Sequence, residues 1–134
     1  MHYWLMKSEP DVFSWDDLVA KGNAEWDGVR NHLAQNHMKA MKKGDQAFFY
    51  HSNVGLEVVG IMEIMEEAAQ DSTDETGKWI AVHVAPVRKL NHPVTLKTIK
   101  ADPALADMAM IRQSRLSVSP VSAAEFRHII ALSQ

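Results

Sequence analysis

The sequence predicts an α+β domain in which helices flank a small, mostly antiparallel β-sheet or β-barrel. The chain has 134 residues, which suits one compact domain over residues 1–134. Three apolar segments with strand patterns follow one another in its middle, joined by short turns. Helical patterns surround them without the regular alternation of strand and helix that a doubly wound fold needs.

The N-terminal segment is predicted to contain a strand and a short helix. Residues 2–6 (HYWLM) form an apolar segment typical of a strand. In the following SWDDLVAKG, Ser14 and Asp17 have the spacing of a capping box, and Gly22 suits the end of the helix.

A second helix is predicted from Asn31 to about Lys43. Its apolar residues recur at helical spacing, namely Leu33, Ala34, Met38 and Met41. Lys42 and Lys43 suit the negative end of the helix dipole, and Gly44 suits the position just after the helix.

The first two of the three central strands are predicted from QAFFYH (46–51) and LEVVGIMEI (56–64). The second of them alternates in a way that indicates at least one buried face. Gly60 within it indicates a bulge or a close approach to another backbone.

The acidic segment 66–78 is predicted to be a loop or a hairpin tip, and KWIAVHVAPVRKL after it to be the third strand. Pro86 in this strand indicates an edge position or a bulge. Thr95 is expected to cap a short helix that ends before Pro103, with a second turn after it. RLSVSPV then predicts a short strand, and SAAEFRHIIAL predicts a C-terminal helix with a Ser122/Glu125 capping box.

Composition excludes several classes of function. With no cysteine, the chain has no disulfide framework, no cysteine nucleophile and no zinc site that uses cysteine. No signal peptide or membrane span is visible, so we expect a cytoplasmic protein, or a nuclear one in a nucleated cell. The sequence does not determine the oligomeric state, for which a monomer is the default expectation.

The net charge of −3 argues against a general electrostatic attraction to nucleic acid. Residues 63–75 hold six acids and no lysine or arginine, whereas the remainder has 14 basic and 11 acidic residues. The remainder could therefore form a modest basic face, with Lys39, Lys42, Lys43, Arg112 and Arg115 as its candidates.

Catalytic and metal-binding patterns are missing. His32 and His37 are about 140° apart around a helix, so they do not share a ligand face. No phosphate-binding glycine loop, dinucleotide fingerprint or nucleophile elbow occurs. The sequence therefore predicts no catalytic residue, no metal and no cofactor.

Flat rings and short polar groups at the ends of elements are the chemistry that remains. Trp26 lies in an irregular approach to the second helix, and Tyr50 closes a strand. Such groups could stack a planar heterocycle and hydrogen-bond its edge. Structural roles stay open, because Trp26 and Tyr50 could be core rings and Asn31 could be a helix N-cap.

Several uncommon sequence motifs occur in an order that resembles the EVE domain over nearly the whole chain. They are YWLMKSEPDVFSWDDL (3–18), WDGVRNHLAQNHM (26–38), KKGDQAFFYHSN (42–53), VVGIMEI (58–64) and LADMAMIRQSRLSVSPVS (105–122). The resemblance implies a PUA-like fold, a small β-barrel flanked by helices and related to YTH domains. It also implies a non-catalytic reader of a modified base in DNA or RNA, such as methylated or hydroxymethylated cytosine or methyladenine.

Carried over residue by residue, the resemblance implies a base-binding pocket with Trp26 as its stacking wall. Its residues would be Lys7, Ser8, Trp26, Gly28, Val29, Arg30, Asn31, Tyr50, His51, Ser52, Ser114, Arg115 and Leu116. Lys7, Arg30 and Arg115 would guide phosphates. The segment 66–77 is short beside many family members, which leaves its contribution to binding open. A nucleoside sensor and a nucleic-acid-processing enzyme remain the alternative functions.

Overall fold

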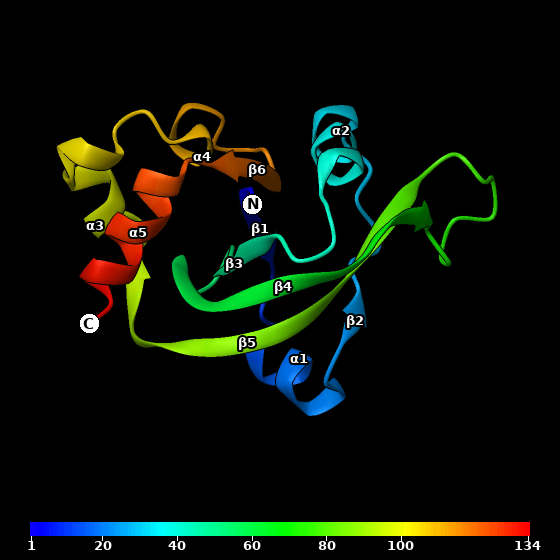
Figure 1. Ribbon diagram of the computed structural model, residues 1–134, viewed down its shortest axis with the longest axis horizontal. Helices are drawn as coiled ribbons and strands as arrows, with labels where there is room; N and C mark the ends of the chain where they lie inside the picture. The colour runs from blue at the N-terminus through cyan, green and yellow to red at the C-terminus, as the bar shows by residue number, and fades with distance from the viewer.

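A six-stranded sheet forms the centre of the computed structural model, which describes residues 1–134 (Figure 1). The strands are β1 (Tyr3–Ser8), β2 (Ala24–Glu25), β3 (Gln46–His51), β4 (Glu57–Gln70), β5 (Ile80–Thr95) and β6 (Val118–Val121). Their order is β2-β5-β4-β3-β1-β6, and every neighbouring pair is antiparallel except β1 and β3. The predicted α+β class is confirmed. The sheet is not closed into the predicted barrel, because β2 and β6 are its two edges and do not pair.

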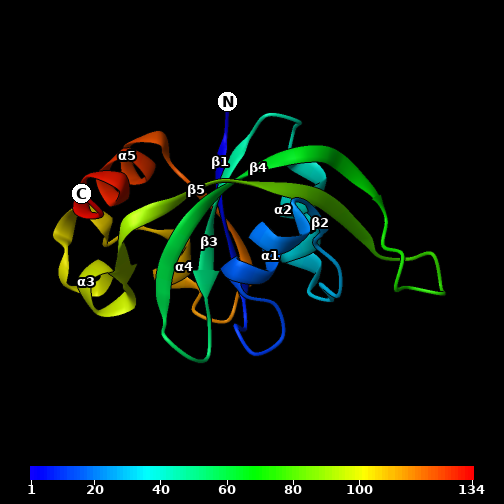
Figure 2. The same ribbon diagram turned by 90° about the horizontal axis from the view of Figure 1, so that it is seen from below.

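Helices cover both faces of this sheet. They are α1 (Trp15–Lys21), α2 (His32–Ala40), α3 (Leu96–Ala101), the 3-10 turn η1 (Pro103–Leu105), α4 (Ala109–Arg112) and α5 (Ala123–Leu132). Figure 2 shows α1 and α2 on one side of β1 and β3, with α3, α4 and α5 on the other. No helix is both long enough and apolar enough to cross a membrane.

Strand alternation divides the core into two clusters, one on each face. Along β1, Trp4 and Met6 join the cluster under α1 and α2, whereas Leu5 joins the cluster under α3–α5. Along β3, Phe49 belongs to the first cluster and Tyr50 to the second. Successive side chains of a strand point to opposite faces, so one strand supplies both cores.

The helix starts confirm the local signals in the sequence. Ser14 and Asp17 form a capping box at α1, and Ser122 and Glu125 form another at α5. Thr95 caps α3, and its side chain accepts from the Thr98 N–H. Each cap satisfies backbone donors that the first helical turn leaves unpaired.

The prediction for α2 was wrong at its end and on one face. The helix ends at Ala40, and Met41 is extended and fully buried, so the chain turns into the core before Gly44. Leu33 is 40% exposed, whereas Gln35 is only 3% exposed. Gln35 can be buried because its amide makes three hydrogen bonds within the chain.

The acidic segment is partly strand, which corrects the predicted loop over 66–78. The strands β4 and β5 run past the rest of the sheet as a two-stranded arm, and residues 71–79 form its tip (Figure 1). Several register shifts interrupt their ladder, one of them beside Pro86 as its position indicated. The two-residue strand β2, which pairs with His83 and Val84 near the start of β5, was not predicted.

Gly60 lies where the pairing of β4 with both neighbours shifts register. A Cβ built on Gly60 would lie 2.5 Å from Cζ3 of Trp15, the first residue of α1. The close approach that Gly60 indicated therefore involves a tryptophan ring, and it seats α1 against the sheet.

Candidate functional site

A cavity of about 730 Å³ opens between the end of β1 and the segment 24–31. We call it the Trp26 cavity. Seven of the residues predicted for the pocket line it, namely Lys7, Ser8, Trp26, Gly28, Val29, Arg30 and Asn31. The KSEP motif (7–10) and the WDGVRN motif (26–31), which are separate in sequence, therefore line the same cavity.

Trp26 is both a core ring and a wall of this cavity. Its ring packs edge-on against Phe49, at 5.4 Å between centroids, and against Phe13, at 6.3 Å. The residue is 7% exposed. Its indole N–H makes no hydrogen bond within the chain, and the only fully buried side-chain polar atom without a partner is Ser119 Oγ. The indole N–H is therefore not fully enclosed, in a residue that lines the cavity.

The segment that carries Trp26 is fixed by a buried carboxylate at the tip of the arm. Asp71 Oδ2 accepts from the Gly28 N–H at 2.9 Å and from Arg30 Nη1 at 3.0 Å. Thr73 donates to the other oxygen of Asp71 through both its hydroxyl and its backbone N–H. Burial alone would raise the pKa of Asp71, but the hydrogen bonds from Thr73, Gly28 and Arg30 lower it to about 2.

A buried glutamine fixes the same segment from α2. Gln35 Nε2 donates to the carbonyls of Val29 and Ile80, each at 2.9 Å, and Gln35 Oε1 accepts from the Ile80 N–H. Asn31 caps α2, with Oδ1 accepting from the Ala34 N–H at 2.9 Å. The Asn31 amide nitrogen has no partner in the chain, so its two N–H groups remain available at the cavity.

Ser8 and Arg30 already have partners. Ser8 Oγ donates to the Phe13 carbonyl at 2.6 Å and so shapes the turn between β1 and α1. The guanidinium of Arg30 is held by Asp71 and lies 5.6 Å from the Trp79 ring centroid. The main role of Arg30 in the structure is therefore to fix the segment that forms the wall of the cavity, through its bond to Asp71.

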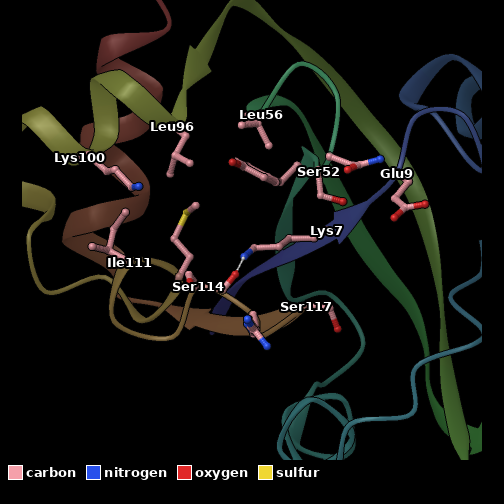
Figure 3. Close-up of a pocket in the computed structure, with 13 residues that line it drawn as sticks. Lys7, Glu9, Ser52, Leu56, Leu96, Lys100, Ile111, Ser114 and Ser117 are labelled. Atoms are coloured by element: carbon pink, nitrogen blue, oxygen red, sulfur yellow. Dashed lines mark hydrogen bonds between the residues drawn. The ribbon is translucent and has the colours of Figure 1, made fainter.

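A second cavity of about 650 Å³ lies at the α3–α4 side of β1 and β3 (Figure 3). We call it the Tyr50 cavity. Five predicted residues line it, namely Lys7, Tyr50, Ser52, Ser114 and Arg115. The sequence-based interpretation placed these residues and Trp26 in one pocket. The structure distributes them over two, because Phe49 and Tyr50 point to opposite faces of β3.

Lys7 lies at the junction of the two cavities and lines both. Lys7 Nζ donates to the Ser114 carbonyl at 2.9 Å, the bond drawn in Figure 3, and lies 5.7 Å from the Tyr50 ring centroid. Burial lowers the pKa of the Lys7 ammonium. Glu9 and Ser117 also line both cavities.

His51 and Leu116 line neither of these cavities. His51 Nε2 accepts from the Trp15 N–H at 3.1 Å and so holds the start of α1. Burial lowers the pKa of His51, and the carboxylates of Glu57 and Asp16 oppose this shift. Leu116 is 5% exposed and belongs to the Trp26 side of the core, beside a shallow hollow that Asn31 and Arg115 also line.

The groups at the Trp26 cavity are suited to binding a ligand. Nowhere are three or more histidine, aspartate or glutamate side chains arranged to hold a metal ion. Trp26 and Asn31 both line the cavity, and neither the Trp26 indole N–H nor the Asn31 amide N–H groups have a partner in the chain. An aromatic surface with donors at its edge suits a planar heterocycle that carries acceptor atoms.

Comparison with known proteins decides the family, because the model of the EVE domain matches residues 2–132. The chain belongs to the EVE domain family. Mouse thymocyte nuclear protein 1 is 36% identical over 167 aligned residues, which cover 99% of this chain and 74% of the mouse protein.

Solved structures agree with this assignment to the EVE domain. A Rhodopseudomonas palustris protein solved by NMR is 52% identical, with a TM-score of 0.94 over 99% of this chain and 93% of that one. Human THYN1 protein, crystallised with DNA containing 5-methylcytosine, is 34% identical, with a TM-score of 0.94 over 100% of this chain and 98% of that one.

The fold extends to a more distant group. The YTH domain of Zygosaccharomyces rouxii MRB1 protein, in complex with N6-methyladenosine RNA, has a TM-score of 0.64 at 16% identity. That match covers 99% of this chain and 86% of the YTH domain, and it shows a shared fold. The predicted relation of the EVE domain to YTH domains is confirmed at this level.

Two residues that fix this EVE domain's cavity were not found from sequence. Asp71 lies within an acidic segment where six acids look alike, and no local pattern distinguishes Asp71 and Asp74, which are buried, from the other four. Gln35 lies among polar helix residues, and only its place one residue after Ala34 in the buried stripe hinted at a role.

Proposed function

We propose that this EVE domain is a non-catalytic reader that binds a modified base of nucleic acid in the Trp26 cavity. The observation that carries the proposal is the Trp26 indole, which borders a cavity and keeps its N–H unpaired. The cavity's volume lies within the ~300–1,000 Å³ typical of small-ligand sites. The human relative crystallised with DNA containing 5-methylcytosine supports this ligand class.

Stacking on an aromatic ring contributes about 1–3 kcal/mol per base and tolerates any base. Selectivity would come from the polar groups at the edge, since a buried polar group left unpaired costs about 1–3 kcal/mol. The free N–H groups of Trp26 and Asn31 would meet acceptors of the base. The apolar flank that Val29 and Phe13 provide would accept a methyl group.

A base must leave its stack to enter such a cavity. Flipping costs a few kcal/mol and costs less for a base that is already unpaired. Lys7 and Arg115 would contact the phosphates, whereas Arg30 is held by Asp71. With a net charge of −3, we expect modest affinity that depends on salt through only a few phosphate contacts.

The test is a binding titration of single-stranded DNA that carries one 5-methylcytosine. Trp26→Ala is expected to weaken binding at least tenfold while the circular-dichroism spectrum stays native. Trp79→Ala is the matched control, because Trp79 lies on the arm and does not line the cavity. Unchanged affinity in a folded Trp26→Ala protein would remove the stacking role.

Two further measurements separate the reader from its alternatives. Incubation with labelled DNA and RNA and divalent metal ions is expected to give no turnover, and a product would instead indicate an enzyme. A free modified nucleoside is expected to bind more weakly than the oligonucleotide. Equal affinity would indicate a nucleoside sensor, since only a nucleic-acid reader gains from phosphates.

A further inference from the structure

We infer that the Tyr50 cavity holds the nucleotide next to the modified base, so that the domain binds two adjacent nucleotides of one strand. This inference rests on the proposed function of the Trp26 cavity. It assigns a ligand to a second hollow that the binding of one base does not use.

The Tyr50 cavity has the make-up of a nucleotide site. Its lining includes four aliphatic or thioether side chains, those of Leu56, Leu96, Met110 and Ile111. It also includes the Tyr50 ring, whose hydroxyl has no partner in the chain and is not enclosed. Burial, together with the carboxylate of Glu57, raises the pKa of Tyr50, so the hydroxyl stays a neutral donor. A base could lie against these walls and hydrogen-bond that hydroxyl.

Charge at this cavity is positive although the chain is negative overall. Three cations line it, Lys7, Lys100 and Arg115, against one carboxylate, Glu9. Lys100 and Arg115 form no ion pair within the chain. Figure 3 shows Lys100 on α3 across the cavity from Lys7 on β1. Unpaired cations on both sides of a partly apolar hollow suit a phosphate ester that bears a ring.

The two cavities meet at the end of β1, where Lys7, Glu9 and Ser117 line both. Lys7 is the one cation that lines both cavities, so a ligand that filled both would pass over Lys7. Adjacent nucleotides are joined by a phosphate, which is the group that Lys7 would meet. A free anion would need only one of the cavities, so the shared border favours a continuous strand.

The experiment compares 5-methyl-dCMP with two dinucleotides in which thymidine is attached on the 5′ or the 3′ side of 5-methyldeoxycytidine. One of the dinucleotides is expected to bind at least tenfold more tightly than the mononucleotide. Lys100→Ala is expected to remove most of this gain, to less than threefold. Lys97→Ala on the same helix is the matched control, because Lys97 is exposed and does not line the Tyr50 cavity.

The outcomes separate the inference from the proposed function. If Trp26→Ala weakens all three ligands but neither dinucleotide gains, or if Lys100→Ala leaves the gain intact, the second-nucleotide inference is overturned alone. If the gain depends on Lys100 but no ligand depends on Trp26, the Tyr50 cavity still binds a nucleotide and the proposed reading site is wrong. If no ligand binds, both are overturned.

Discussion

Arg30 and Asp71 form an ion pair, 3.0 Å from Nη1 to Oδ2, that joins the wall of the Trp26 cavity to the tip of the β4–β5 arm. The carboxylate is fully buried, whereas the guanidinium is 38% exposed. The same carboxylate oxygen accepts from the Gly28 N–H, and Gly28 has a φ of +78°, which favours glycine. The acidic arm therefore positions the segment that carries Trp26.

Replacing the buried carboxylate should loosen this wall. Asp71→Asn is expected to lower the free energy of unfolding by about 2–3 kcal/mol, because it removes one charge of a partly buried pair. It should also weaken binding of 5-methylcytosine DNA severalfold or more. Urea denaturation and a binding titration measure the two effects.

Asp74→Asn is the matched control for this change. Asp74 bonds Thr76 and the Trp79 N–H at the tip of the arm, but it does not touch segment 26–31. It should therefore leave base affinity within twofold of the wild type. Equal losses of affinity in both variants would show that the arm as a whole matters, and not the Asp71 contacts.

Stability should fall in acid because of the same carboxylate. The folded-state pKa of Asp71 is about 2, below its ordinary value of 3.8, so its contribution is complete above about pH 4–5 and is lost as the pH falls towards 2. Asp71→Asn should flatten the dependence of the unfolding free energy on pH between 5 and 2. A slope identical to that of the wild type would contradict this assignment.

The contact between Gly60 and Trp15 predicts a steric effect. Gly60→Ala is expected to cost about 1–3 kcal/mol, because the new methyl group overlaps the Trp15 ring. The same substitution in a Trp15→Leu background should cost clearly less. Thermal unfolding of the four proteins measures the coupling, and an equal cost in both backgrounds would mean that the ring does not cause the effect.

Elements with local signals were predictable from sequence. The capping boxes at Ser14 and Ser122 involve residues three apart, and the structure has both. The end of α2 was not predictable in this way. Burial of Met41 turns the chain before Gly44, and that depends on the core. Long-range pairing likewise makes residues 66–70 strand despite their polar composition.

The candidate site was predictable as a set of residues more than as an arrangement. The motifs around Lys7 and Trp26 line one cavity, as the resemblance implied. Alternation along β3 puts Phe49 and Tyr50 on opposite faces, and Trp26 packs against Phe49, so Trp26 and Tyr50 are divided between the two faces. The role of Asp71 depends on a contact over 43 positions, from Gly28 across the fold, which no local pattern encodes.

The most direct test follows the four indole N–H signals by ¹H–¹⁵N NMR while single-stranded DNA with one 5-methylcytosine is added. Trp4 Nε1 donates to Asp45 at 3.1 Å and serves as an internal reference. We expect the Trp26 indole signal to shift strongly and the Trp4 signal to stay in place, with smaller changes for unmodified DNA. A Trp26 signal that does not move at saturating DNA would contradict binding of the base against that ring.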